Sequence, residues 1–182
     1  MVLAVFTRAG LVDALVGADR KRYPAVDPVE SYSKYLEYPE LEEWFGENMG
    51  GDWVGSVKEL KNVVALSREA NEQISILGDD SVPMDYHNTF WRGELVDFTL
   101  MQQDAFDQVD SFCSLERQGF MMRQIRSICR SNFEFKKYDE IAPWYKRVIN
   151  CIKQMNYTVY DSLQFRKFQE ELEQILVERR KA

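Results

Sequence analysis

Residues able to perform catalysis or bind a metal are sparse in this sequence. His87 is the only histidine, and the three cysteines, Cys113, Cys129 and Cys151, form no C-x-x-C pair. A structural zinc site needs about four such ligands at short spacing, so no metal site is expected. We interpret His87 as a partly buried structural imidazole and the cysteines as reduced, buried thiols of a cytosolic protein.

The familiar catalytic patterns are missing as well. The sequence contains no G-x-x-x-x-G-K-[ST] loop for phosphate and no G-x-S-x-G nucleophile elbow. Paired carboxylates occur at 42–43, 79–80 and 170–171, in polar surroundings that give no reason for a shifted pKa. We therefore predict no catalytic residue within this chain.

Two aromatic residues stand in settings suited to binding a flat ring. Tyr23 precedes the rigid run Pro-Ala-Val-Asp-Pro, and Phe106 lies in the polar stretch QQDAFD, which begins with Gln102 and Gln103. Two rings held in place can stack on both sides of a heterocycle such as a nucleobase. On these features alone the simpler alternative is favoured, in which both rings are ordinary core aromatics.

Helical periodicity dominates from about residue 29 and predicts a mainly α fold. Five amphipathic helices are expected, and they must bury their apolar faces against one another. Asp52 and Ser114 are predicted to cap two of them, Gly78 to end the first, and Pro143 to lie in a first turn. The predicted stripes are Trp53, Val57, Leu60, Val64, Ile74 and Leu77; Met84, His87, Trp91, Leu95 and Phe98; Met121, Met122, Ile125, Ile128 and Cys129; Ile141, Tyr145, Val148, Ile152 and Met155; and Phe165, Phe168, Leu172 and Ile175, in a last helix that is predicted to end in Arg179-Arg180-Lys181.

The first 28 residues differ from the rest. Residues 2–6 could form a strand, 11–16 are a short apolar run, and two prolines stiffen 23–28. We therefore divide the chain into a junction at 1–28 and a helical domain at 29–182. The acidic turn at 78–83 joins two long helices of that domain in a hairpin with an exposed tip.

Composition narrows the function classes. With 45% hydrophobic residues the chain can build a core, and the net charge of −7 argues against a nucleic-acid partner. Only two short basic runs occur, at 20–22 and 179–181. The apolar start at 1–17 is interrupted by Arg8 and Asp13, so we expect neither a membrane span nor a signal peptide, and a soluble protein.

Two motifs resemble a known family. The stretch LMQQDAFDQVDSFCS at 100–114 is similar to the LQQNAFDxVDxxCS pattern of the catalytic A subunit of V-type and archaeal-type rotary ATPases, including bacterial V-type enzymes. The run YPAVDP at 23–28, followed by SYSKY at 31–35, resembles the junction between nucleotide-binding and C-terminal helical domains in rotary ATPases. The similarity extends from about Ala18 to the C-terminus. Asp104 replaces the asparagine of the family pattern. Residues 1–17 do not match the end of the family's nucleotide-binding domain, so this start is either divergent or foreign to the family.

The resemblance implies a C-terminal helical bundle with a short remnant of the nucleotide-binding domain at 1–28. Whole A subunits alternate with B subunits around a central stalk and couple ATP hydrolysis or synthesis to proton or sodium movement. By motif position, Tyr23 and Phe106 would line the adenine side of the nucleotide pocket, with Gln102 and Gln103 beside them. The hairpin tip would contact the central stalk through Asp79, Asp80, Ser81, Val82, Pro83 and Met84.

The same resemblance places the rest of the catalytic machinery upstream. The P-loop, the carboxylate that activates water and the Mg²⁺ ligands belong to the nucleotide-binding domain, so this piece alone is expected to be inactive and to bind ATP or ADP weakly. It would lie in the cytoplasm, peripheral to the membrane and not inserted in it. Two alternatives stay open: a helical interaction module acting alone, and the same domain from a B or F-type β subunit, against which the QQDAFDQVD stretch argues.

Overall fold

The computed structural model describes residues 27, 29, 33–104 and 106–180. Helices dominate these residues, and they contain no strand, only an isolated bridge between Phe133 and Arg180. The prediction of a mainly α fold is therefore confirmed. The possible strand at 2–6 and the proposed junction at 1–28, Asp27 excepted, lie outside the described residues.

The helices alternate with short turns along the chain. None of the described helices has the length and apolar character that crossing a bilayer requires. Their bounds are η1 (Lys34–Glu37), α3 (Pro39–Met49), α4 (Trp53–Leu77), η2 (Asp79–Ser81), α5 (Met84–Val96), the π-helical segment η3 (Asp97–Met101), α6 (Leu115–Arg130), η4 (Tyr138–Glu140), α7 (Ile141–Asn156) and α8 (Leu163–Val177).

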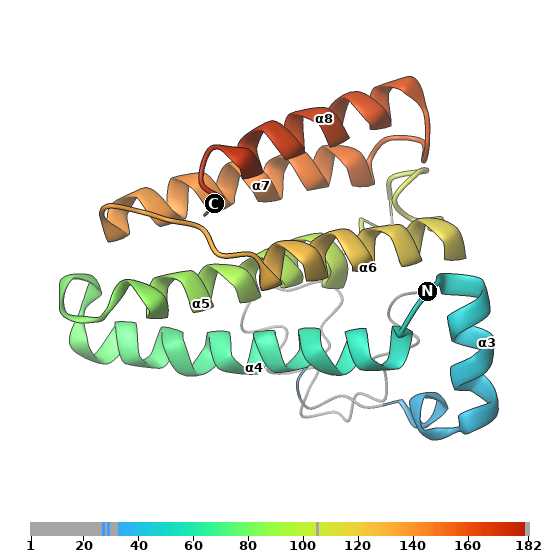
Figure 1. Cartoon of the computed structure of the whole chain (residues 1–182), viewed down its shortest axis with the longest axis horizontal. Coiled ribbons are helices and arrows are strands. Elements are labelled where there is room, and N and C mark those ends of the chain that lie inside the picture. The colour runs from blue at the N-terminus through green and yellow to red at the C-terminus, as the bar shows by residue number, and fades with distance from the viewer. Residues whose placement is uncertain (1–26, 28, 30–32, 105, 181–182) are drawn as a thin grey trace.

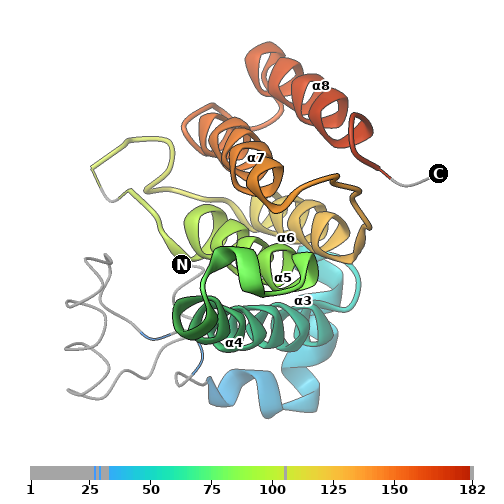
Figure 2. The same ribbon diagram turned by 90° about the vertical axis from the view of Figure 1, so that its left-hand side faces the viewer.

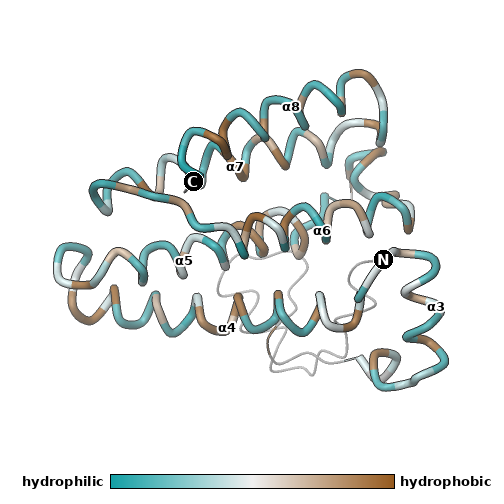
Figure 3. The backbone as a smooth tube through the Cα atoms, in the orientation of Figure 1, coloured by the Kyte–Doolittle hydropathy of each residue, from teal (hydrophilic) through white to brown (hydrophobic). Residues whose placement is uncertain are grey.

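The longer helices stack in layers. Helices α4 and α5 form an antiparallel hairpin, and α6, α7 and α8 follow above it when the molecule is seen along the helices (Figure 2). Helix α3 stands across the ends of α4 and α6 (Figure 1). Figure 3 shows hydrophobic and hydrophilic residues alternating along each helix, as expected when one face of each is buried.

Local sequence signals set several helix ends as predicted. The Asp52 carboxylate accepts a hydrogen bond from the Gly55 backbone N–H at 2.7 Å, and the Ser114 hydroxyl oxygen accepts one from the Arg117 N–H at 3.3 Å. Gly78, with a φ of 85°, ends α4 in a conformation that favours glycine. Both predicted caps and the predicted stop are confirmed.

One continuous core joins all the longer helices. The predicted stripes of α6 and α7 are entirely buried, and most of the stripe residues of α4, α5 and α8 are buried or half-buried. Two predictions at the hairpin are wrong, because Leu77 is 53% and Met84 41% exposed. The last two turns of α4 extend beyond the packed part of the molecule, so its apolar stripe ends before Leu77.

Two close approaches fix the helix packing. A Cβ on Gly119 of α6 would lie 2.0 Å from the Met49 carbonyl oxygen at the end of α3. A Cβ on Gly93 of α5 would lie 2.1 Å from the Ser67 Cβ of α4, whose hydroxyl donates to the Phe90 carbonyl at 2.9 Å. Glycine at these points lets the helices approach more closely than any larger residue allows.

Candidate functional site

The loop between η3 and α6 displays Phe106. The Phe106 ring is 94% exposed, so the interpretation as a core aromatic is wrong for this residue. A phenylalanine in water contributes no burial energy to this chain. A large exposed apolar side chain is instead typical of a surface that meets a ligand or another domain.

Carboxylates brace the backbone on both sides of Phe106. The buried Asp110 accepts a hydrogen bond from the Asp104 N–H at 2.6 Å, and Asp104 in turn accepts one from the Phe106 N–H at 2.9 Å. Asp107 accepts from the Val109 and Asp110 N–H groups, both at 2.8 Å. Burial raises the pKa of Asp110. These side-chain to backbone bonds hold the loop in turns and fix the base of the exposed ring.

Gln102 and Gln103 brace the same loop. The Gln102 amide donates to a carboxylate oxygen of Asp97 at 3.2 Å, and the Gln103 amide donates to the Asp110 carbonyl. Both side chains are half-buried, so part of each is accessible beside the loop. Their proposed place at the edge of a nucleotide pocket stays a prediction.

A small cavity of about 30 Å³ lies under the loop. It has room for one or two water molecules and not for a nucleobase. Phe106 does not line this cavity, so the cavity is not the proposed base-binding site. Tyr23 lies outside the described residues, so the pairing of the two rings stays a prediction. The lining residues are Thr99, Leu100, Gln102, Gln103, Asp110, Cys113, Gln118, Met121 and Asn156.

A buried arginine, which sequence reasoning missed, ties this loop to α7. Arg117 is 3% exposed and donates to the carbonyl oxygens of Val109 at 3.4 Å, Met155 at 3.0 Å and Asn156. A cation at a helix C-terminus is favourable because the last carbonyl groups carry partial negative charge. The available signal was spacing, because Arg117 lies one turn before Met121 on the predicted apolar stripe of α6.

The hairpin tip forms a second candidate site. Of the six residues predicted to contact a partner, Asp79, Asp80, Ser81, Pro83 and Met84 are exposed, whereas Val82 is buried. Ile76 and Leu77 add exposed apolar side chains at the end of α4. The tip is therefore both acidic and apolar, a combination that fits a partner surface better than plain solvent.

Packing against the turn before α7 holds the tip in place. The Nε2–H of His87 donates to the Asp79 carbonyl at 3.0 Å, and the His87 ring stacks on Tyr138 with centroids 5.2 Å apart. Tyr138 also hydrogen-bonds Asp80, and that bond together with the charge of Asp80 raises the pKa of the Tyr138 phenol. His87 is 6% exposed, so it is buried more completely than predicted, and its contacts with Asp79 and Tyr138 give it a structural role.

An ion pair anchors the start of the described chain on α4. The Asp27 carboxylate oxygens lie 2.7 and 2.8 Å from Nη2 of Arg68, and Asp27 also accepts from the Val29 N–H at 2.8 Å. Asp27 is 6% exposed. Sequence reasoning missed Arg68, although it follows Val64 by one turn on the stripe of α4. The proposed junction is thus connected to the helix that ends at the hairpin tip.

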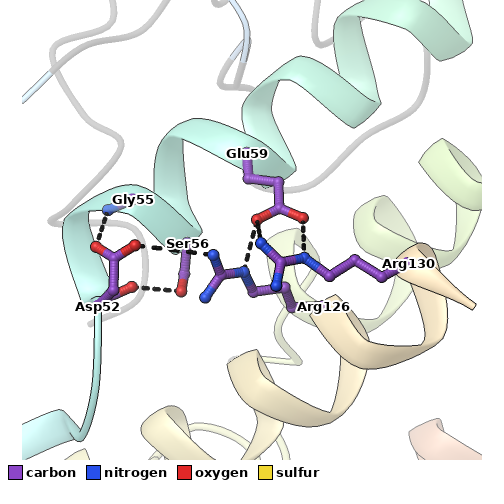
Figure 4. Close-up of polar contacts among 6 residues, drawn as sticks. All are labelled: Asp52, Gly55, Ser56, Glu59, Arg126 and Arg130. Atoms are coloured by element: carbon purple, nitrogen blue, oxygen red, sulfur yellow. Dashed lines mark hydrogen bonds and ion pairs between the residues drawn. The ribbon is translucent and has the colours of Figure 1, made fainter.

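A second charged group locks α4 to α6 (Figure 4). Glu59 accepts hydrogen bonds from Arg126 at 2.6 Å and from Arg130 at 2.6 and 2.7 Å. Arg126 also lies 3.7 Å from Asp52. Hydrogen bonds from Arg130 and Arg126 lower the pKa of Glu59. The group has a structural role, because every member is engaged with another.

Comparison with known proteins identifies the family to which the sequence is similar. The model for the C-terminal domain of V and A type ATP synthase matches residues 42–141, which include the hairpin tip and the Phe106 loop. The V-type ATP synthase alpha chain of Protochlamydia amoebophila (strain UWE25) is 31% identical over 159 residues, covering 87% of this chain and 26% of that protein. The alpha chain of Chlamydia pneumoniae is 30% identical with the same coverage. The chain thus spans about a quarter of the length of these relatives.

Proposed function

The chain belongs to the family of C-terminal domains of V- and A-type ATP synthases, and we propose that it serves as the C-terminal part of a catalytic A subunit. The whole subunit would couple ATP hydrolysis or synthesis to the movement of protons or sodium ions. The observation that carries this proposal is the exposed Phe106, held on a carboxylate-braced loop inside the family-matched stretch.

On the nucleotide side, Phe106 would pack against adenine, opposite Tyr23. Its exposed face suits stacking, which requires only an accessible π surface. The phosphates and Mg²⁺ would be held by the rest of the subunit. Among the described residues there is no group of three or more His, Cys, Asp or Glu side chains placed to hold a metal. This piece would therefore supply one wall of the site and none of its phosphoryl-transfer chemistry.

On the mechanical side, the hairpin tip would contact the central stalk. The 25-residue helix α4 is about 37 Å long, and Arg68, which binds Asp27, lies nine residues, or about 14 Å, before its end at the tip. The contacts of His87 and Tyr138 hold the tip against η4, so a displacement of the domain would move the tip with it. B subunits and the stalk are the proposed partners, with the complex on the cytoplasmic side of the membrane.

Nucleotide binding by the 182-residue chain tests the first part. Stacking of a base contributes about 1–3 kcal/mol per aromatic ring, so Phe106 and Tyr23 together would supply an amount comparable to the ~4 kcal/mol that a 1 mM Kd requires. We expect a fluorescent ATP analogue to bind with a Kd of about 1 mM or weaker and ATP hydrolysis to be undetectable. Measurable turnover by this chain would refute the proposed division of the site.

Charge reversal in the complete complex tests the second part. Asp79→Lys/Asp80→Lys should impair ATP-driven ion transport while leaving nucleotide affinity unchanged, because the tip is far from the Phe106 loop along α5. The matched control is Glu170→Lys/Glu171→Lys on α8, which should leave transport normal. Normal transport in the tip variant would argue against stalk contact and favour the alternative of a separate interaction module.

A further inference from the structure

The outer face of α3 carries four exposed side chains, and none of the described helices covers them. Glu40, Glu43, Trp44 and Glu47 follow the spacing i, i+3, i+4, i+7, which places them on one side of the helix. Trp44 is 42% exposed. The opposite side of α3 is buried through Phe45 and Met49. We call the four residues the α3 outer face.

The helix beneath this face is firmly seated. Phe45 stacks on Trp53 of α4 with ring centroids 6.4 Å apart, and the guanidinium of Arg123 donates to the Met49 carbonyl at 2.8 Å. The Trp44 ring meets the Phe45 ring edge-on at 5.4 Å. An aromatic side chain held in this way loses little freedom when a partner covers it.

Folding explains only part of the charge of this face: Glu40 lies in the first turn, where the helix dipole favours a carboxylate, whereas Glu43 and Glu47 lie beyond it. Residues 35–57 contain six carboxylates and no lysine or arginine. Glu43 is three residues from Glu40 and four from Glu47, spacings at which like charges destabilise a helix, and Glu47 lies near the unfavourable negative end of the helix dipole. None of the ion pairs between described residues involves a carboxylate of α3.

We propose that the α3 outer face is a docking surface for a basic segment of another protein, with an arginine or lysine placed over Trp44. Tryptophan is the best aromatic partner for a cation, and carboxylates around it complete the attraction for a second and third basic side chain. The negative charge of the α3 outer face repels nucleic acid and anionic lipid. Aromatic residues are also enriched at the centres of protein interfaces. This proposal does not depend on the ATP synthase function.

The 182-residue chain can be tested with a defined probe. A 14-residue amphipathic peptide of leucine and arginine, without aromatic residues, is titrated while tryptophan fluorescence and heat are recorded. Trp53 and Trp144 are buried and Trp91 is half-buried, so the spectral change reports mainly on Trp44. We expect a Kd of the order of 10 μM in 25 mM salt, weakened at least about fivefold in 300 mM salt by screening.

Three variants locate the binding surface. Trp44→Ala should abolish the spectral change and weaken binding by calorimetry about fivefold. Glu40→Gln/Glu43→Gln/Glu47→Gln should weaken it about tenfold. The control Glu170→Gln/Glu171→Gln/Glu173→Gln on α8 removes the same charge and should bind as the wild type does. Circular dichroism checks that each variant is folded.

Several outcomes would overturn the proposal. No binding by the wild type would show that the face does not take a basic segment, and equal loss in both triple variants would show that only bulk charge matters. A dimer in sedimentation that Trp44→Ala dissociates would identify a second copy as the occupant. Tighter peptide binding after removal of residues 1–22 would show that the chain's own basic run at 20–22 covers the face.

Discussion

Arg117 shows how single residues secure the candidate site. Its buried guanidinium bonds backbone carbonyl oxygens of the Phe106 loop and of the last turn of α7, so one side chain joins two segments. Asp27 and Arg68 do the same for the start of the described chain and α4. Removing one partner of such a bond leaves the other buried and unsatisfied, which costs more than the bond itself contributes.

Thiol reactivity gives a prediction at the level of single residues. Burial raises the pKa of Cys129 to about 12 and that of Cys151 to about 11, so neither forms appreciable thiolate at pH 8. Cys113 is half-buried, and burial raises its pKa as well. We expect Ellman's reagent to modify no thiol other than Cys113 in the native chain, and slowly, but all three in urea. Fast reaction of two thiols in the folded chain would contradict the described burial.

Glu59 gives a prediction about pH. Hydrogen bonds from Arg130 and Arg126 hold its pKa below the usual 4.5, so its stabilising effect is present above pH 4.5 and is lost as the pH falls through the lower folded-state pKa. Glu59→Gln should reduce the free energy of unfolding by about 0.5–1 kcal/mol at pH 7. Urea titrations should show this difference shrinking below pH 4.5. A difference that is constant with pH would mean that the carboxylate charge is not involved.

At the level of elements, the positions of the regular helices could be predicted from the sequence, but which parts of each helix the other helices cover could not. The stripes of α6 and α7 were predicted correctly because burial repeats with the helical period, and the Ser114 cap of α6 depends only on residues close in the chain. Leu77 and Met84 were placed in the core wrongly, since the overhang of the hairpin depends on where other helices end. Helix α3 was not singled out, because four glutamates in eleven residues obscure its short apolar face.

The residues of the candidate site were likewise predicted only in part. The residues around Phe106 alone favoured a core aromatic, and the resemblance to the family placed its ring beside a nucleotide; the ring is 94% exposed. Arg68 and Arg117 were missed because Asp27, the partner of Arg68, and Met155 and Asn156, two of the partners of Arg117, lie 38 to 41 residues away along the chain. Similarly, α8 ends at Val177 and not in the basic run, because Arg179 turns toward Glu140 at 2.8 Å. Such long-range contacts leave no periodic signal in the sequence.

The α3–α6 contact can be tested through one glycine. Gly119→Ala would place a Cβ 2.0 Å from the Met49 carbonyl oxygen, so the two helices must separate, at a cost of about 1–3 kcal/mol. In the control Gly46→Ala, the nearest atom to the Cβ is 3.6 Å away, and helix propensity should add up to ~1 kcal/mol of stability. Urea denaturation measures both. Equal effects of the two substitutions would show that the helices are not so close.

For the whole molecule, the family-matched stretch and the core have different limits. The match ends at residue 141, whereas the core continues through Tyr145, Ile152, Phe165 and Leu172. Trp144 also donates its indole N–H to the Ile175 carbonyl at 3.1 Å, joining α7 to α8. Helices α7 and α8 are therefore part of one folding unit with the hairpin and not an independent addition.

Truncation tests this unity. A chain ending at Glu140 loses the buried side chains of α7 and α8 and the carbonyl oxygens that hold Arg117. Three or four buried residues, at about 1.5–3 kcal/mol each, already match the ~5–15 kcal/mol that stabilises a whole domain. We expect this chain to lose its near-ultraviolet circular dichroism and cooperative unfolding. A control ending at Val177 loses the ion pairs of Glu178, Arg179 and Arg180 and the bridge from Arg180 to Phe133, but no buried apolar side chain, and should unfold cooperatively. If the shorter chain also unfolds cooperatively, α7 and α8 are an added layer, and the hairpin that we assign to the stalk is stable without them.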